Sequence, residues 1–141
     1  MTEIELEIIA HDFIKENEQP FDYELDQLPA LDESPYSWAD DLILSLTVHA
    51  PDQLWDIILT ILHKDPPISV LAVLAAGPLE DYLATNNEGF IVNVENRAKE
   101  DPKFASLLAG VWQNRMTDET WARVQKVWDR SGWDGITKEQ P

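Results

Sequence analysis

Apolar residues recur at helical spacing through most of the chain from residue 38 onward. The clearest stripe follows the pair Asp101-Pro102, with apolar side chains three or four positions apart at Phe104, Leu107, Leu108, Val111 and Trp112. This spacing places side chains on one face of an α-helix. An Asp followed by Pro is typical of a helix start, because Asp caps free N–H groups and Pro suits the first turn. The pattern therefore predicts a helix from Pro102 that buries this stripe.

Three further segments carry similar signals. Ser37 is a candidate N-cap for a helix whose predicted buried side is formed by Trp38, Leu42, Ile43 and Leu46. The segment 51–65 begins with a first-turn proline and is apolar on more than one face, which predicts a central helix. Thr117 is expected to cap a helix that runs to about Arg130 and presents Trp121, Val124 and Trp128 on one face.

Shifting the chain against itself by 36 residues aligns two helix, Asp-Pro, helix units. Ile58 falls on Val94, Leu71 falls on Leu107, and Asp65-Pro66 falls on Asp101-Pro102. Helical-hairpin repeats such as HEAT have periods in this range. The expected fold class is all-α, as a single domain of helical hairpins with a HEAT-like two-unit repeat or as an irregular helical bundle. This domain spans 1–130, includes an acidic segment 1–41, and precedes a C-terminal tail, 131–141.

The first 36 residues give a mixed signal. Glu alternates with Ile and Leu in "TEIELEI", which is a strand pattern, whereas Ile4, Ile8 and Phe13 suit a helix. Because no second alternating segment offers a partner strand, a helix to about Asn17 is favoured. The proline-containing segment 18–36 is predicted to be an extended connection.

The stretch "VLAVLAAGPLED", residues 70–81, reads as a junction between two helices. Gly77 is predicted to be a left-handed C-cap, and Pro78 is expected in the first turn of the next helix. A phosphate-binding loop would need several glycines and usually a lysine, whereas Glu80 and Asp81 follow here. Helix packing is therefore the favoured interpretation.

This stretch, with "DPKFASLLAGVWQNRMTDETWARV" further on, resembles a family of small bacterial proteins known only as a domain of unknown function. The resemblance covers about 51–128, and it implies a fold and a bacterial origin but no activity. Its "GPLED" element corresponds to Gly77, Pro78, Leu79, Glu80 and Asp81, and its "VWQN" element corresponds to Val111, Trp112, Gln113 and Asn114. Gln113 and Asn114 either satisfy helix-end carbonyls or line a polar groove with Glu80 and Asp81.

Charge narrows the range of partners. The chain has 27 acidic and 10 basic residues, for a formal net charge of -17. Segment 1–41 holds thirteen of the acids and only one base, Lys15. Such a field repels nucleic acid and anionic membranes and attracts basic proteins, although acidity can also serve solubility alone. The candidate partner-binding residues combine these carboxylates with two aromatic side chains: Asp22, Glu24, Asp26, Asp32, Glu33, Tyr36, Trp38, Asp40 and Asp41.

No motif for catalysis or metal binding is found in the sequence. The three histidines, His11, His49 and His63, are too far apart along the chain for a helical metal pair, and no Gly-x-Ser-x-Gly segment occurs. We therefore expect no enzymatic activity, no metal and no cofactor. The chain has no cysteine, and neither a signal peptide nor an apolar run of membrane-spanning length is recognised, so a cytoplasmic protein is expected.

Two functions fit these observations. The first is an acidic immunity protein or inhibitor that neutralises a basic partner, such as a toxin nuclease, by occluding its nucleic-acid or substrate site. The alternative is a non-enzymatic adaptor that binds a protein or peptide on its helical-repeat surface.

Overall fold

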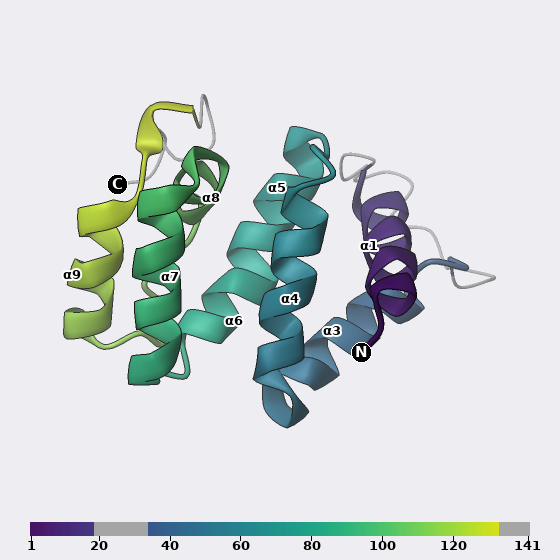
Figure 1. Cartoon of the computed structure of the whole chain (residues 1–141), viewed down its shortest axis with the longest axis horizontal. Coiled ribbons are helices and arrows are strands. Elements are labelled where there is room, and N and C mark those ends of the chain that lie inside the picture. The colour runs from purple at the N-terminus through teal and green to yellow at the C-terminus, as the bar shows by residue number, and fades with distance from the viewer. Residues whose placement is uncertain (19–33, 133–141) are drawn as a thin grey trace, which may run out of the picture. The chain divides into compact units, whose positions relative to one another are not determined.

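The computed structural model describes residues 1–18 and 34–132, and every regular element among them is helical (Figure 1). This confirms the all-α fold class. The elements are α1 (Glu3–Asn17), α3 (Trp38–His49), α4 (Pro51–Leu62), α5 (Ile68–Leu74), the π-helical turn η1 (Ala75–Leu79), α6 (Glu80–Leu83), α7 (Glu88–Glu100), α8 (Pro102–Leu108), α9 (Asp118–Val127) and the 3-10 turn η2 (Arg130–Gly132). None of the described helices combines the length and apolarity that a membrane span requires.

The chain divides into two compact units, unit 1 (Met1–Val70) and unit 2 (Leu71–Pro141). The expected organisation as one domain over 1–130 stays a prediction, and the tail from residue 133 lies outside the described residues.

In unit 1, α1, α3 and α4 pack against one another. Helix α1 begins with a capping box, in which the Thr2 hydroxyl accepts the Glu5 N–H and the Glu5 carboxylate accepts the Thr2 N–H. This capping box stabilises the first turn of α1. The predicted helix to about Asn17 is thereby confirmed. Of the three apolar residues that suit a helix, Phe13 enters the core together with Ile9, whereas Ile4 and Ile8 are exposed.

Helices α3 and α4 differ in how far they are covered. Helix α4 is central as predicted, with Leu54, Ile57 and Ile58 fully buried. Helix α3 buries only Ala39, Ile43 and Leu46. Ser37 precedes α3, but its hydroxyl donates to the Ser34 carbonyl instead of capping the helix. The predicted burial of Trp38 is also wrong, since this side chain is 40% exposed.

The Gly-Pro stretch does not separate two helices. Helix α5 continues through η1 into α6, and Gly77 lacks the left-handed φ of a C-cap. Pro78 has no N–H and would clash with the carbonyl four residues earlier in a regular α-helix. The wider π-helical turn accommodates the proline without a break, which is the physical reason why the predicted junction is wrong.

In unit 2, α7 packs against α8 and α9. Asp101 caps α8 as predicted, because its carboxylate accepts the Lys103 N–H. The helix ends at Leu108, however, so Val111 and Trp112 do not continue its stripe, and Trp112 is 48% exposed. The turn at residues 109–110 directs the chain away before the apolar pattern ends.

The end of α9 differs from the prediction, and the 36-residue repeat is not confirmed. Helix α9 ends at Val127 instead of about Arg130, since Trp128 has an extended backbone and its ring lies edge-on to Trp121. In the 36-residue register, Asp101 is an extended N-cap with φ of -129°, whereas Asp65 is left-handed with φ of 51°. The aligned Asp-Pro pairs therefore start their helices differently, and the HEAT-like repeat stays a prediction.

Candidate functional site

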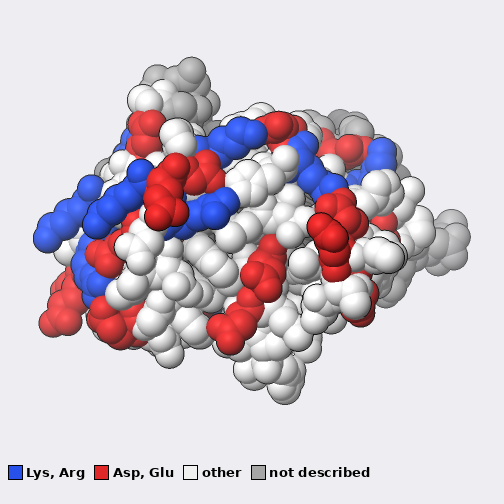
Figure 2. Space-filling view, in the orientation of Figure 1, with Lys and Arg blue, Asp and Glu red and all other residues white. Residues whose placement is uncertain are grey.

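The two units differ sharply in charge. Unit 1 holds sixteen of the acidic residues and two of the basic ones, a net charge of -14, whereas unit 2 holds eleven and eight, a net charge of -3. In the view of Figure 2, the blue side chains gather mainly over α7, α8 and α9. Among the described residues of unit 1, Lys15 pairs with Glu18 at 3.6 Å and Lys64 pairs with Glu7. Two lysines cannot neutralise sixteen carboxylates, so unit 1 keeps a large negative excess.

Within unit 1, α1 and the start of α3 form an acidic-aromatic cluster, defined here as His11, Asp12, Tyr36, Trp38 and Asp40. The Asp12 carboxylate accepts the indole Nε1–H of Trp38 at 2.6 Å and contacts His11 Nδ1 at 2.8 Å. The rings of His11 and Tyr36 meet edge-on with centroids 6.4 Å apart. The hydrogen bond to Asp12 orients the Trp38 indole, while 40% of the residue stays accessible.

The two aspartates of the cluster have opposite pKa shifts. The pKa of Asp12 lies below its ordinary value because of the hydrogen bonds from His11 and then from Trp38. The pKa of Asp40 is raised, chiefly by burial and further by the charges of Glu16 and Asp41, against the hydrogen bond that Asn17 Nδ2 donates at 3.1 Å. A cation brought close to Asp40 would stabilise its charged form, so this carboxylate is suited to meet a Lys or Arg side chain.

The structure brings only part of the predicted partner surface together. Tyr36, Trp38 and Asp40 join α1 in the cluster, and Asp41 is exposed in the first turn of α3. The remaining candidates lie outside the described residues: Asp22, Glu24, Asp26, Asp32 and Glu33. His11, Asp12 and Asn17 were missed, because nothing in the local sequence links Asp12 to a tryptophan 26 residues away.

The predicted groove residues of unit 2 form a network of internal contacts. Glu80 is only 7% exposed, and its carboxylate accepts the Trp112 backbone N–H at 2.9 Å and Asn114 Nδ2 at 3.3 Å. Asp81 pairs with Arg115 at 3.2 Å. Gln113 donates to the Met116 carbonyl and to Asp118. This geometry favours a role in packing over a polar binding groove. Glu80 of the "GPLED" element binds Trp112 and Asn114 of the "VWQN" element, and so holds that loop against α6.

Asn86 completes this network and was missed from the sequence. Its backbone is left-handed with φ of 56°, which asparagine tolerates better than most residues. Its side chain accepts the Thr117 N–H at 2.8 Å and donates to the Arg115 carbonyl at 3.2 Å. The Asn86-Asn87 pair was recognisable as a helix break, but its link to residues 115–117 depends on the tertiary fold.

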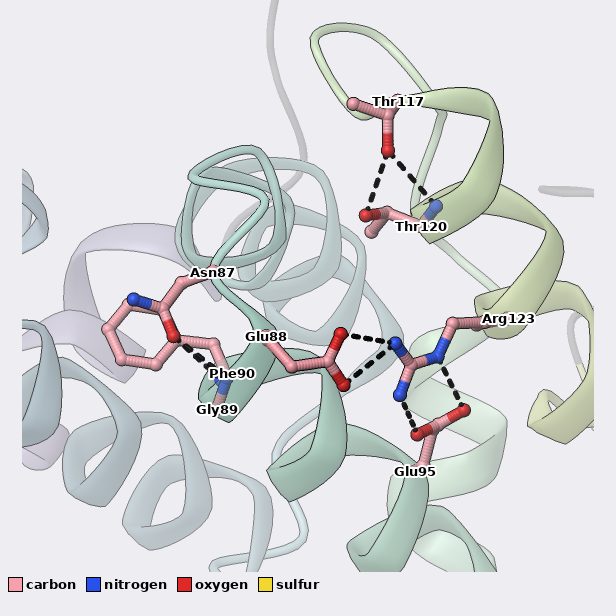
Figure 3. Close-up of polar contacts among 8 residues, drawn as sticks. All are labelled: Asn87, Glu88, Gly89, Phe90, Glu95, Thr117, Thr120 and Arg123. Atoms are coloured by element: carbon pink, nitrogen blue, oxygen red, sulfur yellow. Dashed lines mark hydrogen bonds and ion pairs between the residues drawn. The ribbon is translucent and has the colours of Figure 1, made fainter.

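Arg123 connects α9 to α7 and illustrates how unit 2 uses its basic residues (Figure 3). Its guanidinium donates twice to Glu88, at 2.8 and 2.9 Å, and twice to Glu95, at 3.0 and 2.6 Å. These hydrogen bonds, chiefly those to Glu95 and then those to Glu88, raise the pKa of Arg123, and the bonds to Glu95 lower the pKa of that carboxyl group. Arg123 is therefore engaged within the unit.

The described residues contain no group of three or more His, Asp or Glu side chains placed to hold a metal ion. The carboxylates of the acidic-aromatic cluster are engaged by His, Trp and Asn side chains instead. What this surface offers is negative charge beside fixed aromatic rings, which together attract guanidinium and ammonium groups.

A family model described as "Family of unknown function (DUF6869)" matches residues 26–132. The resemblance stated from the sequence is thereby confirmed, and the match reaches further toward the N-terminus than the expected boundary at residue 51. The matched region includes residues 26–36, which lie outside the resemblance found in the sequence. The chain has no match among the curated proteins or among the solved structures compared.

Proposed function

Because the chain belongs to this family of unknown function, we propose its function from its own surface: it is a non-enzymatic binder of a basic protein. The most specific form of the proposal is an immunity protein or inhibitor that covers the nucleic-acid or substrate site of a toxin or a similar basic protein. A cytoplasmic location belongs to the same proposal.

The single observation that carries the proposal is the difference in charge between the units. Unit 2 balances eleven acids with eight bases and uses Arg115 and Arg123 in internal pairs. Unit 1 holds sixteen acids against two lysines. Solubility alone gives no reason for this asymmetry, whereas attraction of a basic partner to one unit does.

The proposed mechanism has two steps. The field of unit 1 first draws in the basic surface of the partner, which raises the association rate more than the final affinity. The partially exposed Trp38 then packs against the partner, while Asp40 and Asp41 accept hydrogen bonds from its Lys or Arg side chains. Carboxylates at the partner's basic site would take the place of substrate phosphates.

The test compares two variants that each remove four negative charges from the full chain. The first is Asp26→Asn/Asp32→Asn/Glu33→Gln/Asp41→Asn in unit 1. The matched control changes four unit 2 acids to amides: Glu100, Glu119, Asp134 and Glu139. The partner is captured at low salt from a lysate of the source organism, identified by mass spectrometry and purified. Surface plasmon resonance then gives its association rate with each variant at low and high salt.

The proposal predicts that the unit 1 variant associates about tenfold more slowly than the control at low salt, and that high salt reduces this difference. Equal association rates for the two variants would overturn it. A rate that changes little with salt for the wild-type chain would instead favour the adaptor function.

A further inference from the structure

The outward face of α1 carries an apolar stripe that the described part of unit 1 leaves uncovered. Ile4 and Ile8 lie one helical turn apart and are 73% and 50% exposed. The His11 side chain, one turn further along, is 60% exposed. Helical spacing places these three residues opposite the buried Ile9 and Phe13. An exposed isoleucine pair on a helix with five acidic residues and one lysine is unfavourable in water and marks a surface suited to contact.

This stripe is continuous with the acidic-aromatic cluster. His11 contacts the ring of Tyr36, and Asp12, the next residue on α1, holds the Trp38 indole. A line of apolar and aromatic groups therefore runs from the first turn of α1 to the start of α3. Such a narrow line along one helix matches another helix better than it matches a broad surface.

Carboxylates border the stripe on both sides. Helical spacing places Glu3 and Glu7 along one edge and Glu5 and Asp12 along the other. Figure 2 shows red and white side chains side by side over α1. An apolar centre between two acidic edges is complementary to a helix whose apolar stripe is bordered by Lys and Arg.

We propose that this face of α1 docks a basic amphipathic helix of the partner. The inference rests on the function proposed above and names the structural class of the partner surface. Apolar residues of the docking helix, spaced three and four positions apart, pack along Ile4, Ile8 and Trp38. Its Lys and Arg side chains meet the carboxylates at both edges, where Glu7 also pairs with Lys64 and Asp12 also accepts the Trp38 indole N–H.

The charge of unit 1 argues against two other occupants. A second copy of the chain would bring two strongly acidic faces together, and an anionic membrane would be repelled in the same way. Both stay as outcomes of the experiment below.

The experiment uses fluorescence anisotropy with a labelled synthetic peptide, in which leucines at three- and four-residue spacing are bordered by Lys and Arg. A scrambled peptide of identical composition serves as the ligand control. The test variant of the full chain is Ile4→Ser/Ile8→Ser. The matched variant, Leu44→Ser/Val48→Ser, removes two aliphatic side chains of α3 that are 65% and 77% exposed. Since all four side chains lie largely outside the core, circular dichroism should show both variants folded.

The patterned peptide is expected to bind the wild-type chain at least about tenfold more tightly than the scrambled peptide. Ile4→Ser/Ile8→Ser should weaken that binding by about tenfold, and the α3 variant by less than about twofold. Equal binding of the two peptides, or equal loss in the two variants, would overturn the inference. Self-association or binding to phosphatidylserine vesicles that is lost with Ile4→Ser/Ile8→Ser would also overturn it.

Failure here is separable from failure of the proposed function. If the serine variants behave alike while the unit 1 amide variant still slows association of the purified partner, only the docking helix is wrong. If the amide variant matches its unit 2 control, the proposed function itself fails.

Discussion

Replacing Glu80 tests whether the stability of unit 2 depends on one buried carboxylate. Glu80→Ala removes the acceptor for the Trp112 N–H and for Asn114 Nδ2. A hydrogen bond to a charged group contributes about 1.5 to 3 kcal/mol. Because Asn114 is exposed and its amide can bond water instead, only the Trp112 contact is counted in full. We therefore expect a loss of about 2 to 3 kcal/mol in the free energy of unfolding.

The neighbouring carboxylate supplies the control. Asp81 forms one ion pair with Arg115, whose side chain is 68% exposed, and such pairs contribute less than about 1 kcal/mol. Asp81→Asn should therefore change stability little. Urea denaturation followed by circular dichroism measures both variants, and hydrogen exchange of the Trp112 amide reports the local contact. Equal stability of the Glu80 and Asp81 variants, or an unchanged Trp112 exchange rate, would show that the buried Glu80 carboxylate does not stabilise unit 2.

Three further predictions concern other parts of the chain. Gly77→Ala should raise the free energy of unfolding, measured by urea denaturation, by about 0.5 to 1 kcal/mol, because a Cβ there meets no atom within 4 Å and the backbone is not left-handed. A loss of stability would instead indicate that Gly77 adopts the left-handed C-cap expected from the sequence. Arg123→Met should destabilise unit 2 by about 1 to 2 kcal/mol, and combining it with Glu95→Gln should cost little more, since the pair acts as one interaction. In a carboxyl NMR titration, Asp12 should ionise below and Asp40 above an exposed aspartate. Asp12 then contributes stability that is lost as the pH falls through its folded pKa, whereas ionisation of Asp40 reduces stability as the pH rises through its own. Titration of both at the ordinary value would contradict this.

The helical fold could be predicted because its signals are local. Asp101 and Thr117 cap helices where their sequence context predicts, and α4 is central because it is apolar on more than one face. Helix ends were less predictable. The apolar pattern continues past Leu108 to Trp112, but the chain turns away first, and the Trp112 N–H then donates to Glu80, a residue 32 positions earlier.

The candidate site was predictable in charge but not in geometry. The acidic bias of segment 1–41 and the aromatic pair Tyr36 and Trp38 are visible in the sequence. The partners of these aromatic residues on α1 come from a distant part of the chain, and no periodicity identifies them. Helical spacing groups Ile4 and Ile8 with Phe13, but only Phe13 is buried, because apolar spacing alone gives no sign of which face other helices cover.

A hydrogen-exchange map of the chain bound to its purified partner tests most directly whether unit 1 carries the partner surface. We expect slowed exchange on binding in 1–17 and 34–49, which hold α1 and α3, with little change in α7 to α9. Protection confined to unit 2, with α1 and the start of α3 exchanging as in the free chain, would contradict the claim that the acidic unit carries the partner surface.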